Sequence, residues 1–181
     1  MVLVIAAVGK SGSGKTTTLE YLVSNLASEG YRIGAVKHIF HKGFKMDKEG
    51  TNTWRYAKAG SKVIAAVSTE EIVVIRKAET ELNDLEQVIG LLGNEHLDII
   101  VVEGFRSIIE KRNDVLKIIT AKDADSLKKA LEGTVQPIIA VAGLIGKQKP
   151  KIKLEIPVIN IPEEGSQLLK LVKQQLKAKA S

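Results

Sequence analysis

Residues 9–16, which read GKSGSGKT, combine glycine, lysine and threonine at a spacing that binds nucleotide phosphates. They match the pattern G-x-x-x-x-G-K-[ST] in full. The glycines let the backbone curl so that several N–H groups point at one anion. In this pattern Lys15 neutralises the β- and γ-phosphates and the Thr16 hydroxyl binds Mg²⁺. The segment therefore predicts a P-loop, a site for a nucleoside triphosphate with Mg²⁺.

Two carboxylates are candidates for the acid that completes such a magnesium site. Glu103 ends the apolar run IIVVE, and P-loop proteins hold the metal shell with an acid of this kind. Asp47 lies in the polar segment 41–53, where a solvated loop carboxylate is the equal alternative. Asp98 begins the same run as Glu103, at the end far from the expected nucleotide, and is set aside. We predict Lys15, Asp47 and Glu103 as catalytic residues, and Thr16, Asp47 and Glu103 as metal ligands.

Lys10, His38 and His41 have roles that the sequence leaves open. Lys10 holds the second position of the pattern, where it either reaches across a dimer to the partner's nucleotide or is a surface lysine. His38 and His41 flank Phe40, but residues three apart on a strand or loop face opposite sides. Since the chain contains no cysteine, contact with phosphate or a partner is favoured over zinc. Local hydrogen bonding within the loop is the alternative.

The elements that must position these residues are visible in the apolar patterning. The continuous apolar run at residues 2–8 predicts a strand buried on both faces, and helical spacing then continues to Gly30. Further strands are predicted at 32–40, 97–105, 115–120 and 156–161, and residues 137–146 predict a strand that leads into a glycine-bearing loop. Further helices are predicted at 53–61, at 82–94 with Asn94 ending it, at 123–133 capped by Asp123 or Asp125, and at 163–179. Residues 62–68 and 71–77 predict an antiparallel pair at the sheet edge, joined at Thr69 and Glu70.

Strands alternate with helices along most of the chain. This order implies right-handed β-α-β units and a mostly parallel, twisted sheet with helices on both faces. Together with the phosphate-binding pattern, it predicts an α/β protein with the three-layer P-loop NTPase fold. No repeat, long linker or low-complexity segment interrupts residues 1–181. We therefore expect a single nucleotide-binding domain.

The bulk composition excludes several classes of protein. With 44% apolar and 27% charged residues among 181, the chain has the composition of a globular domain. The apolar start is too short to span a membrane and has no basic segment before it, so we expect a cytoplasmic protein without membrane contact. The net charge is +6, but few aromatic residues lie among the C-terminal lysines. We therefore expect a solvated basic surface rather than nucleic-acid binding, with an acidic ligand or partner as the alternative.

Residues 34–61, GAVKHIFHKGFKMDKEGTNTWRYAKAGS, together with VVEGF at 101–105, resemble the molybdopterin-guanine dinucleotide biosynthesis protein B family. The resemblance covers roughly residues 2–105 and includes the P-loop. It implies a GTP-binding adaptor, usually a homodimer, with weak GTPase activity and Mg²⁺ as cofactor. It also implies that the chain assists the guanylyltransferase, protein A, which joins GMP to molybdopterin in making molybdenum cofactor. Direct contact with molybdopterin is a further expectation.

The same resemblance assigns roles to individual residues. Asp47 and Glu103 would face the metal or the attacking water. Phosphates and Mg²⁺ would be held by Gly9, Gly12, Gly14, Lys15, Thr16 and Thr17, while Lys37, His38, His41, Thr53 and Arg55 would line the nucleotide or pterin side. Lys10, Ser11, Ser13 and Gly104 complete the predicted nucleotide-binding set. The N-K-x-D guanine reader of regulatory GTPases is absent from the sequence, so the preference for GTP over ATP rests on the resemblance.

Three other functions stay open on the residues alone. A P-loop small-molecule kinase using ATP would need arginines in a lid, for which Arg106 and Arg112 are the candidates. A nucleic-acid-linked ATPase is suggested by the basic charge, and its binding would weaken steeply with salt. A metallochaperone GTPase is encouraged only by His38 and His41. The adaptor needs no lid, nucleic-acid module or thiols and is therefore preferred.

Overall fold

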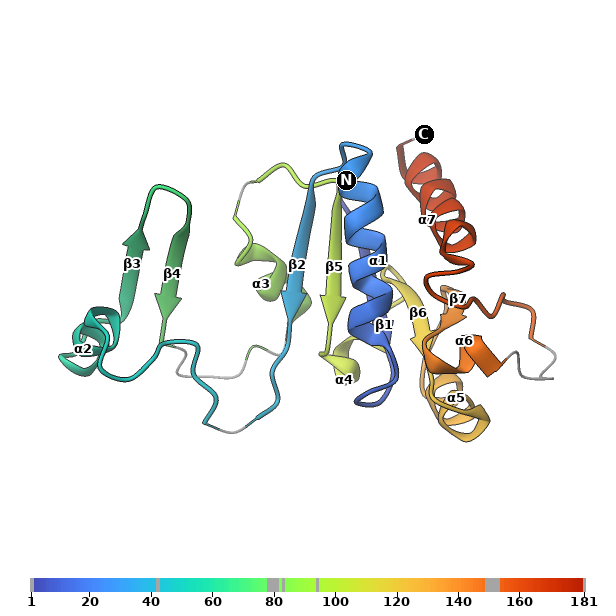
Figure 1. Ribbon diagram of the computed structural model, residues 1–181, viewed down its shortest axis with the longest axis horizontal. Helices are drawn as coiled ribbons and strands as arrows, with labels where there is room; N and C mark the ends of the chain where they lie inside the picture. The colour runs from blue at the N-terminus through green and yellow to red at the C-terminus, as the bar shows by residue number, and fades with distance from the viewer. Residues whose placement is uncertain are drawn as a thin grey trace. The chain divides into compact units, whose positions relative to one another are not determined.

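The computed structural model describes residues 2–41, 43–77, 82, 84–93, 95–148 and 154–180. The chain forms two compact units, each visible in Figure 1. The larger unit comprises Met1–His38 and Asn83–Ser181, and the smaller unit comprises Ile39–Leu82. The single domain expected from the sequence stays a prediction. Among the described residues, no helix is both long and apolar enough to span a bilayer.

The larger unit is built on a five-stranded parallel sheet with the strand order β2-β5-β1-β6-β7. The strands are β1 (Leu3–Val8), β2 (Ile33–Lys37), β5 (Ile99–Glu103), β6 (Leu116–Thr120) and β7 (Ile138–Ala142). All six residues of β1 are buried, as its unbroken apolar run predicts. Because the strands are parallel, the segments that follow β1, β5 and β6 leave the sheet at the same edge. This edge is where the predicted P-loop and Glu103 lie.

Helices cover both faces of this sheet (Figure 1). They are α1 (Lys15–Ser28), α3 (Leu85–Gly90), α4 (Arg106–Ile109), α5 (Ala124–Glu132), α6 (Leu144–Gln148) and α7 (Gly165–Ala180). One apolar cluster joins Leu22 of α1 and Leu168 of α7 to Ile5 of β1. The other joins Leu127 of α5 and Ile145 of α6 to alternate residues of the same strand. The two clusters confirm the three-layer α/β arrangement.

The smaller unit differs from the sequence prediction in one respect. Strands β3 (Val63–Val67) and β4 (Ile72–Arg76) form the predicted antiparallel pair, with Ser68 and Glu71 hydrogen-bonded across the turn. The predicted placement at the edge of the main sheet is wrong, because the pair is a separate two-stranded sheet. Helix α2 (Asn52–Lys58) packs against β3, and Ile64 is buried in the unit. The pair therefore has a covering element of its own.

Two predicted elements of the larger unit are shorter than expected, and two short helices were not predicted. The strand expected at 156–161 is reduced to one bridge, between Val141 and Val158, because Pro157 and Pro162 cannot donate to a ladder. Helix α3 ends at Gly90, earlier than the pattern suggests, and Asn94 lies outside the described residues. The short helices α4 and α6 carry too few residues for a helical period to show in the sequence.

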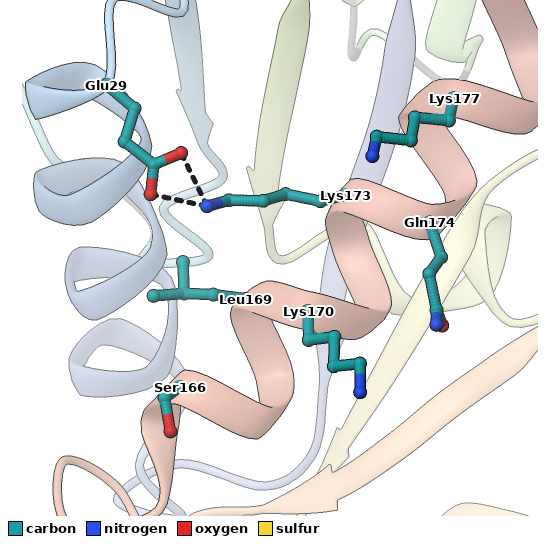
Figure 2. A pocket seen from close by; sticks show the side chains of 7 residues that line it. All are labelled: Glu29, Ser166, Leu169, Lys170, Lys173, Gln174 and Lys177. Carbon is teal, nitrogen blue, oxygen red and sulfur yellow. Dashed lines mark hydrogen bonds and ion pairs between the residues drawn. The ribbon is translucent and has the colours of Figure 1, made fainter.

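A hollow of about 540 Å³ lies between α7 and the end of α1 (Figure 2). The Lys173 ammonium binds both oxygens of Glu29 there, each at 2.5 Å. The remaining lining residues are Ser166, Leu169, Lys170, Gln174 and Lys177. Part of the positive charge of the chain is thus spread along an exposed helix face, as expected of a solvated basic surface.

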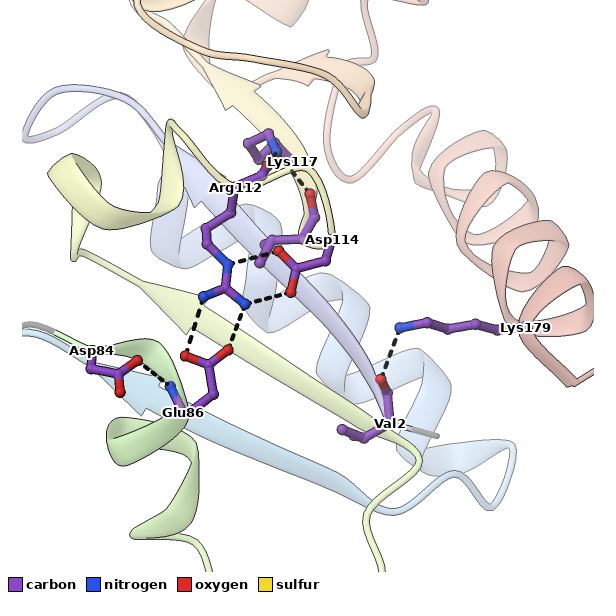
Figure 3. Close-up of polar contacts among 8 residues, drawn as sticks. Val2, Asp84, Glu86, Arg112, Asp114, Lys117 and Lys179 are labelled. Atoms are coloured by element: carbon purple, nitrogen blue, oxygen red, sulfur yellow. Dashed lines mark hydrogen bonds and ion pairs between the residues drawn. The ribbon is translucent and has the colours of Figure 1, made fainter.

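An ion-pair network ties α3 to the segment before β6 (Figure 3). The Arg112 guanidinium donates to Glu86 at 2.5 and 3.2 Å and to Asp114 at 2.5 and 2.7 Å. The buried Lys117 ammonium donates to the carbonyl of Val115 at 2.9 Å beside it. The hydrogen bond from Arg112 lowers the pKa of Glu86 to about 2, and the ordinary value is 4.5. The network therefore favours ionised Glu86 in the folded chain.

The substitution Glu86→Gln should change how stability depends on pH. Because folding lowers the pKa of Glu86, the stabilisation by its charge is present above about pH 4.5 and is lost as pH falls toward about 2. Wild type should therefore be more stable than the variant near pH 7, and the difference should shrink between pH 4.5 and 3. Urea unfolding at several pH values measures it. Glu20→Gln, at an exposed site on α1, is the control, and an equal pH dependence in both variants would contradict the pairing.

Candidate functional site

The P-loop connects β1 to α1 and depends on glycine at defined places. Gly12 and Gly14 have φ angles of 68° and 99°, which are unfavourable for other residues. A Cβ added to Gly9 would overlap the carbonyl oxygen of Thr120, at the end of β6. A Cβ added to Gly14 would lie 2.8 Å from the α-carbon of Gly143. The loop therefore curls tightly against the ends of two neighbouring strands.

Contacts from β6 and the turn after β7 hold the loop in this shape. The buried Ser13 hydroxyl is 2.7 Å from the hydroxyl of Thr120. The backbone N–H of Leu144 donates to the Ser13 carbonyl at 3.2 Å. Gly143 has a φ of 87°, and a Cβ there would overlap the same carbonyl oxygen. Thr120 and Gly143 therefore support the loop, although the sequence analysis assigned neither of them to the site.

Lys15 and Thr16, the first residues of α1, face the end of β5. The Lys15 ammonium donates to the carbonyls of Gly9 at 3.1 Å and Lys10 at 2.9 Å. Burial lowers the pKa of Lys15, while Glu103 opposes this shift. The Thr16 hydroxyl donates to the Glu103 carboxylate at 2.9 Å. The structure thus brings together three of the predicted site residues.

Glu103 also contacts the end of β2 on its other side. Lys37 is directly opposite Glu103 in the register of β2 and β5, and the two side chains form an ion pair. The His38 backbone N–H donates to the Glu103 carbonyl at 2.8 Å. The His38 ring stacks on Phe105 with centroids 4.4 Å apart. A Cβ on Gly104 would lie 2.5 Å from that of His38, so glycine allows this close approach.

The predicted residues His41, Asp47, Thr53 and Arg55 all belong to the smaller unit. Asp47 accepts hydrogen bonds from the hydroxyls of Thr51 at 3.2 Å and Thr53 at 2.8 Å. Its other oxygen lies 3.6 Å from the Lys77 ammonium and accepts no hydrogen bond from the described residues. Thr51 in turn caps α2. Asp47 and Thr53 therefore form a local network, and their part in nucleotide binding stays a prediction.

A second hollow, of about 620 Å³, adjoins the P-loop. Its lining residues are Lys10, Ser11, Lys122, Asp123, Asp125, Ser126 and Lys129. Asp123 caps α5 by accepting from the Ser126 N–H at 2.7 Å, which settles the choice between the two predicted caps. Hydrogen bonds from Ser126 lower the pKa of Asp123, and the charges of Lys10 and Lys122 add to the shift. The hollow thus combines lysines with carboxylates close to Lys10 of the loop.

Comparisons of the sequence with known proteins point to one family. Residues 4–144 match the family model for molybdopterin guanine dinucleotide synthesis protein B, MobB. The chain is 31% identical over 122 residues to a putative molybdopterin-guanine dinucleotide biosynthesis adapter protein of Methanocaldococcus jannaschii. That match covers 67% of this chain and 48% of the relative, so the chain spans about half the length of the archaeal protein. The adapter protein of Haemophilus influenzae is 30% identical over 134 residues, with 74% of this chain and 70% of that protein covered.

Solved structures show the same architecture. A MobB homologue from Bacillus stearothermophilus superposes with a TM-score of 0.69 at 20% identity, covering 97% of this chain and 98% of the other. Bacillus subtilis MobB also gives 0.69, at 22% identity, with 93% and 97% covered. These similarities confirm the predicted α/β, P-loop NTPase-like fold. From its family match and its sequence relatives, we conclude that the chain belongs to the molybdopterin guanine dinucleotide synthesis protein B family.

Proposed function

We propose that this chain is a cytoplasmic GTP-binding adaptor that assists the attachment of GMP to molybdopterin. The relatives named as adapter proteins in molybdopterin-guanine dinucleotide biosynthesis support the role. The observation that carries the nucleotide site is the meeting of Lys15, Thr16 and Glu103 at the end of the parallel sheet. The guanylyltransferase, protein A, is the proposed partner, and the pterin is the proposed ligand of the complex.

The residues at the sheet edge fit a nucleotide with magnesium. The loop N–H groups and Lys15 bind the phosphates, because the ammonium already lies at the loop beside Gly9. Thr16 and Glu103 provide a hydroxyl and a carboxylate oxygen, the hard ligands that Mg²⁺ prefers together with phosphate and water. When bound, the metal supplies positive charge to the phosphates. A Glu103 carboxylate that binds the metal is not also free to accept a proton from the attacking water, which fits slow hydrolysis.

The hollow beside Lys10 is the proposed place for the nucleoside. It lies next to the P-loop and is roomy enough for a base and a sugar. Guanine offers two adjacent donors, N1–H and the 2-amino group, to a carboxylate, whereas adenine has no 2-amino group and presents an acceptor at N1. Asp123 already caps α5, so Asp125 is the carboxylate available for reading guanine.

Asp125→Asn should therefore weaken GTP binding and leave ATP binding unchanged. Losing a hydrogen bond to a charged acceptor costs about 1.5–3 kcal/mol, so we expect a loss of about tenfold or more. Calorimetric titrations with each nucleotide and Mg²⁺ measure the ratio. Glu132→Gln, at the other end of α5, serves as the charge-matched control. An equal loss for both nucleotides would show that Asp125 does not read the base.

The contacts of two arginines argue against the kinase alternative. Arg106 pairs with Glu110 at 2.9 Å, and Arg112 is occupied by Glu86 and Asp114. A kinase lid needs arginines that are free to clamp the transferred phosphoryl group. Both candidates instead form ion pairs within the larger unit, and the adaptor remains the better proposal.

A homodimer belongs to the same proposal. The β3–β4 pair exposes apolar side chains on one face, including Val67 at 72% and Ile72 at 71%. An exposed apolar patch of this kind marks a surface that is covered in use. Light scattering of the purified chain should give about twice its mass of 19.6 kDa. A monomer mass at micromolar concentration would contradict the dimer.

The function is tested by titrating the chain with GTP and with ATP, each with Mg²⁺. Tight GTP binding with little ATP binding supports the adaptor, and a preference for ATP would sink it and favour a kinase. The second arm adds the guanylyltransferase and measures formation of the dinucleotide cofactor with and without this chain. Stimulation that requires GTP is the expected result.

A further inference from the structure

The Glu103 carboxylate lies between a hydroxyl and a second ammonium group. One oxygen accepts from Thr16 at 2.9 Å, and the other is paired with Lys37. The Glu103 side chain is 12% exposed and that of Lys37 is 53% exposed. The ammonium group of the half-exposed Lys37 therefore contacts one carboxylate oxygen of the proposed metal site.

The backbone register makes this pairing a built-in feature of the sheet. Lys37 and Glu103 are directly opposite each other on adjacent parallel strands, and the His38 N–H donates to the Glu103 carbonyl just beyond them. Cross-strand neighbours keep their Cβ atoms close, so Lys37 cannot leave the neighbourhood of Glu103 while the sheet is intact. The Lys37 ammonium can only swing about its flexible stem.

The charges at this edge do not favour a cation in the absence of nucleotide. The charges of Lys15, Lys37 and Glu103 are close enough to affect one another. Glu103 raises the pKa of Lys15, and Lys37 lowers the pKa of Lys15. Two ammonium groups face one carboxylate, which leaves an excess of positive charge. A nucleoside triphosphate brings several negative charges and reverses this balance.

We propose that Lys37 holds the place of Mg²⁺ on Glu103 and thereby makes metal binding depend on the nucleotide. The inference rests on the proposed nucleotide site, because it concerns the same carboxylate. With nucleotide bound, Lys37 turns from Glu103 toward the phosphates and Glu103 is free to accept the metal. Lys37 is thus a positioning residue that sets the order of binding, with the metal entering together with the triphosphate.

The test measures Mn²⁺ binding by electron paramagnetic resonance in the absence of nucleotide. Lys37→Met should bind Mn²⁺ about tenfold more tightly than wild type, the coupling expected of a partly exposed charge pair. Lys37→Gln gives a second neutral variant in case the first does not fold, as checked by thermal unfolding. Lys37→Arg keeps the charge and should match wild type, as should Lys170→Met at an exposed site on α7. Wild-type affinity in both neutral variants would overturn the proposal.

Two further arms separate this inference from the proposed function. Adding Glu103→Gln to Lys37→Met should remove the gain, and a gain that persists would place the extra Mn²⁺ elsewhere and overturn the proposal. Wild type should bind Mn²⁺ more tightly with GTP than without it. If GTP binds to wild type and leaves its Mn²⁺ affinity unchanged, this inference is overturned, whereas a failure of GTP to bind at all would refute the nucleotide site itself. The comparison of nucleotide-free variants still decides whether Lys37 competes with a metal for Glu103.

Discussion

Lys15→Ala should reduce GTP binding by at least about 100-fold, because two charge-assisted hydrogen bonds to phosphate are lost. The Lys15 ammonium donates hydrogen bonds to the carbonyls of Gly9 and Lys10. These contacts place it at the loop, where we expect phosphate oxygens to replace the carbonyl oxygens as its partners. Burial also lowers the pKa of Lys15, because its ammonium group is incompletely solvated. An anionic ligand that contacts this ammonium compensates for the lost solvation and is therefore bound more strongly.

The folded state should tolerate this change well. Lys15 is the first residue of α1 and belongs to neither of the two apolar clusters formed by the described residues. The variant should therefore unfold at the same temperature as wild type. A loss of GTP binding, measured by calorimetry with Mg²⁺, can then be assigned to the missing ammonium group. Lys128→Ala, at an exposed site on α5, removes the same charge away from the loop and should bind like wild type. Retained binding in Lys15→Ala would move the nucleotide site away from residues 9–16.

The core of the site was predictable because its signals are local. The apolar run of β1, the glycine pattern and the helical spacing of α1 are contiguous in sequence, and the structure has them in that order. Glu103 was recognisable as an acid at the end of a fully apolar strand. Parallel pairing of β5 with β1 then brings Glu103 to Thr16, 87 residues away in sequence. Beyond these sequence patterns, only the order of the strands in the sheet was needed to place Glu103 beside Thr16.

The supporting contacts were not predictable, because they come from distant strands. Thr120 touches Ser13 across 107 residues, and nothing near Thr120 marks it as a neighbour of the loop. Lys122 lies over Gly12, which is visible only once β6 is known to flank β1. The separate β3–β4 sheet was not predicted for a related reason, since two apolar runs joined by a short turn define a pair but not the sheet to which it belongs.

Asp47 shows a different limit of sequence reasoning. Asp47 lies in a polar loop, as predicted. Its partners Thr51 and Thr53 are four and six residues away, and nothing in the sequence distinguishes such hydrogen-bonded side chains from side chains that contact only water. Side chains of this type form local hydrogen bonds at helix starts, where they compete with any distant role. The pattern therefore allows both a metal ligand and a loop capping residue.

Gly143→Ala should destabilise the larger unit and weaken nucleotide binding together. The backbone at residue 143 has a φ of 87°, which costs a residue with a Cβ about 1–2 kcal/mol. The new methyl group would also overlap the Ser13 carbonyl oxygen, and overpacking of this kind costs about 1–3 kcal/mol more. We expect a total loss of about 2–5 kcal/mol in the free energy of unfolding.

Gly30→Ala is the matched control for this prediction. Gly30 has a φ of 91° but no atom within 4 Å of an added Cβ, so only the backbone cost of about 1–2 kcal/mol applies. Urea unfolding should show a larger loss of stability in Gly143→Ala than in Gly30→Ala. Calorimetry with GTP should show weaker binding in Gly143→Ala alone, because the overlap at residue 143 is relieved by moving Ser13 of the P-loop. If both variants lose stability equally and bind GTP equally, the turn after β7 does not support the loop. The steric contact between residues 13 and 143 would then be relaxed elsewhere at little cost.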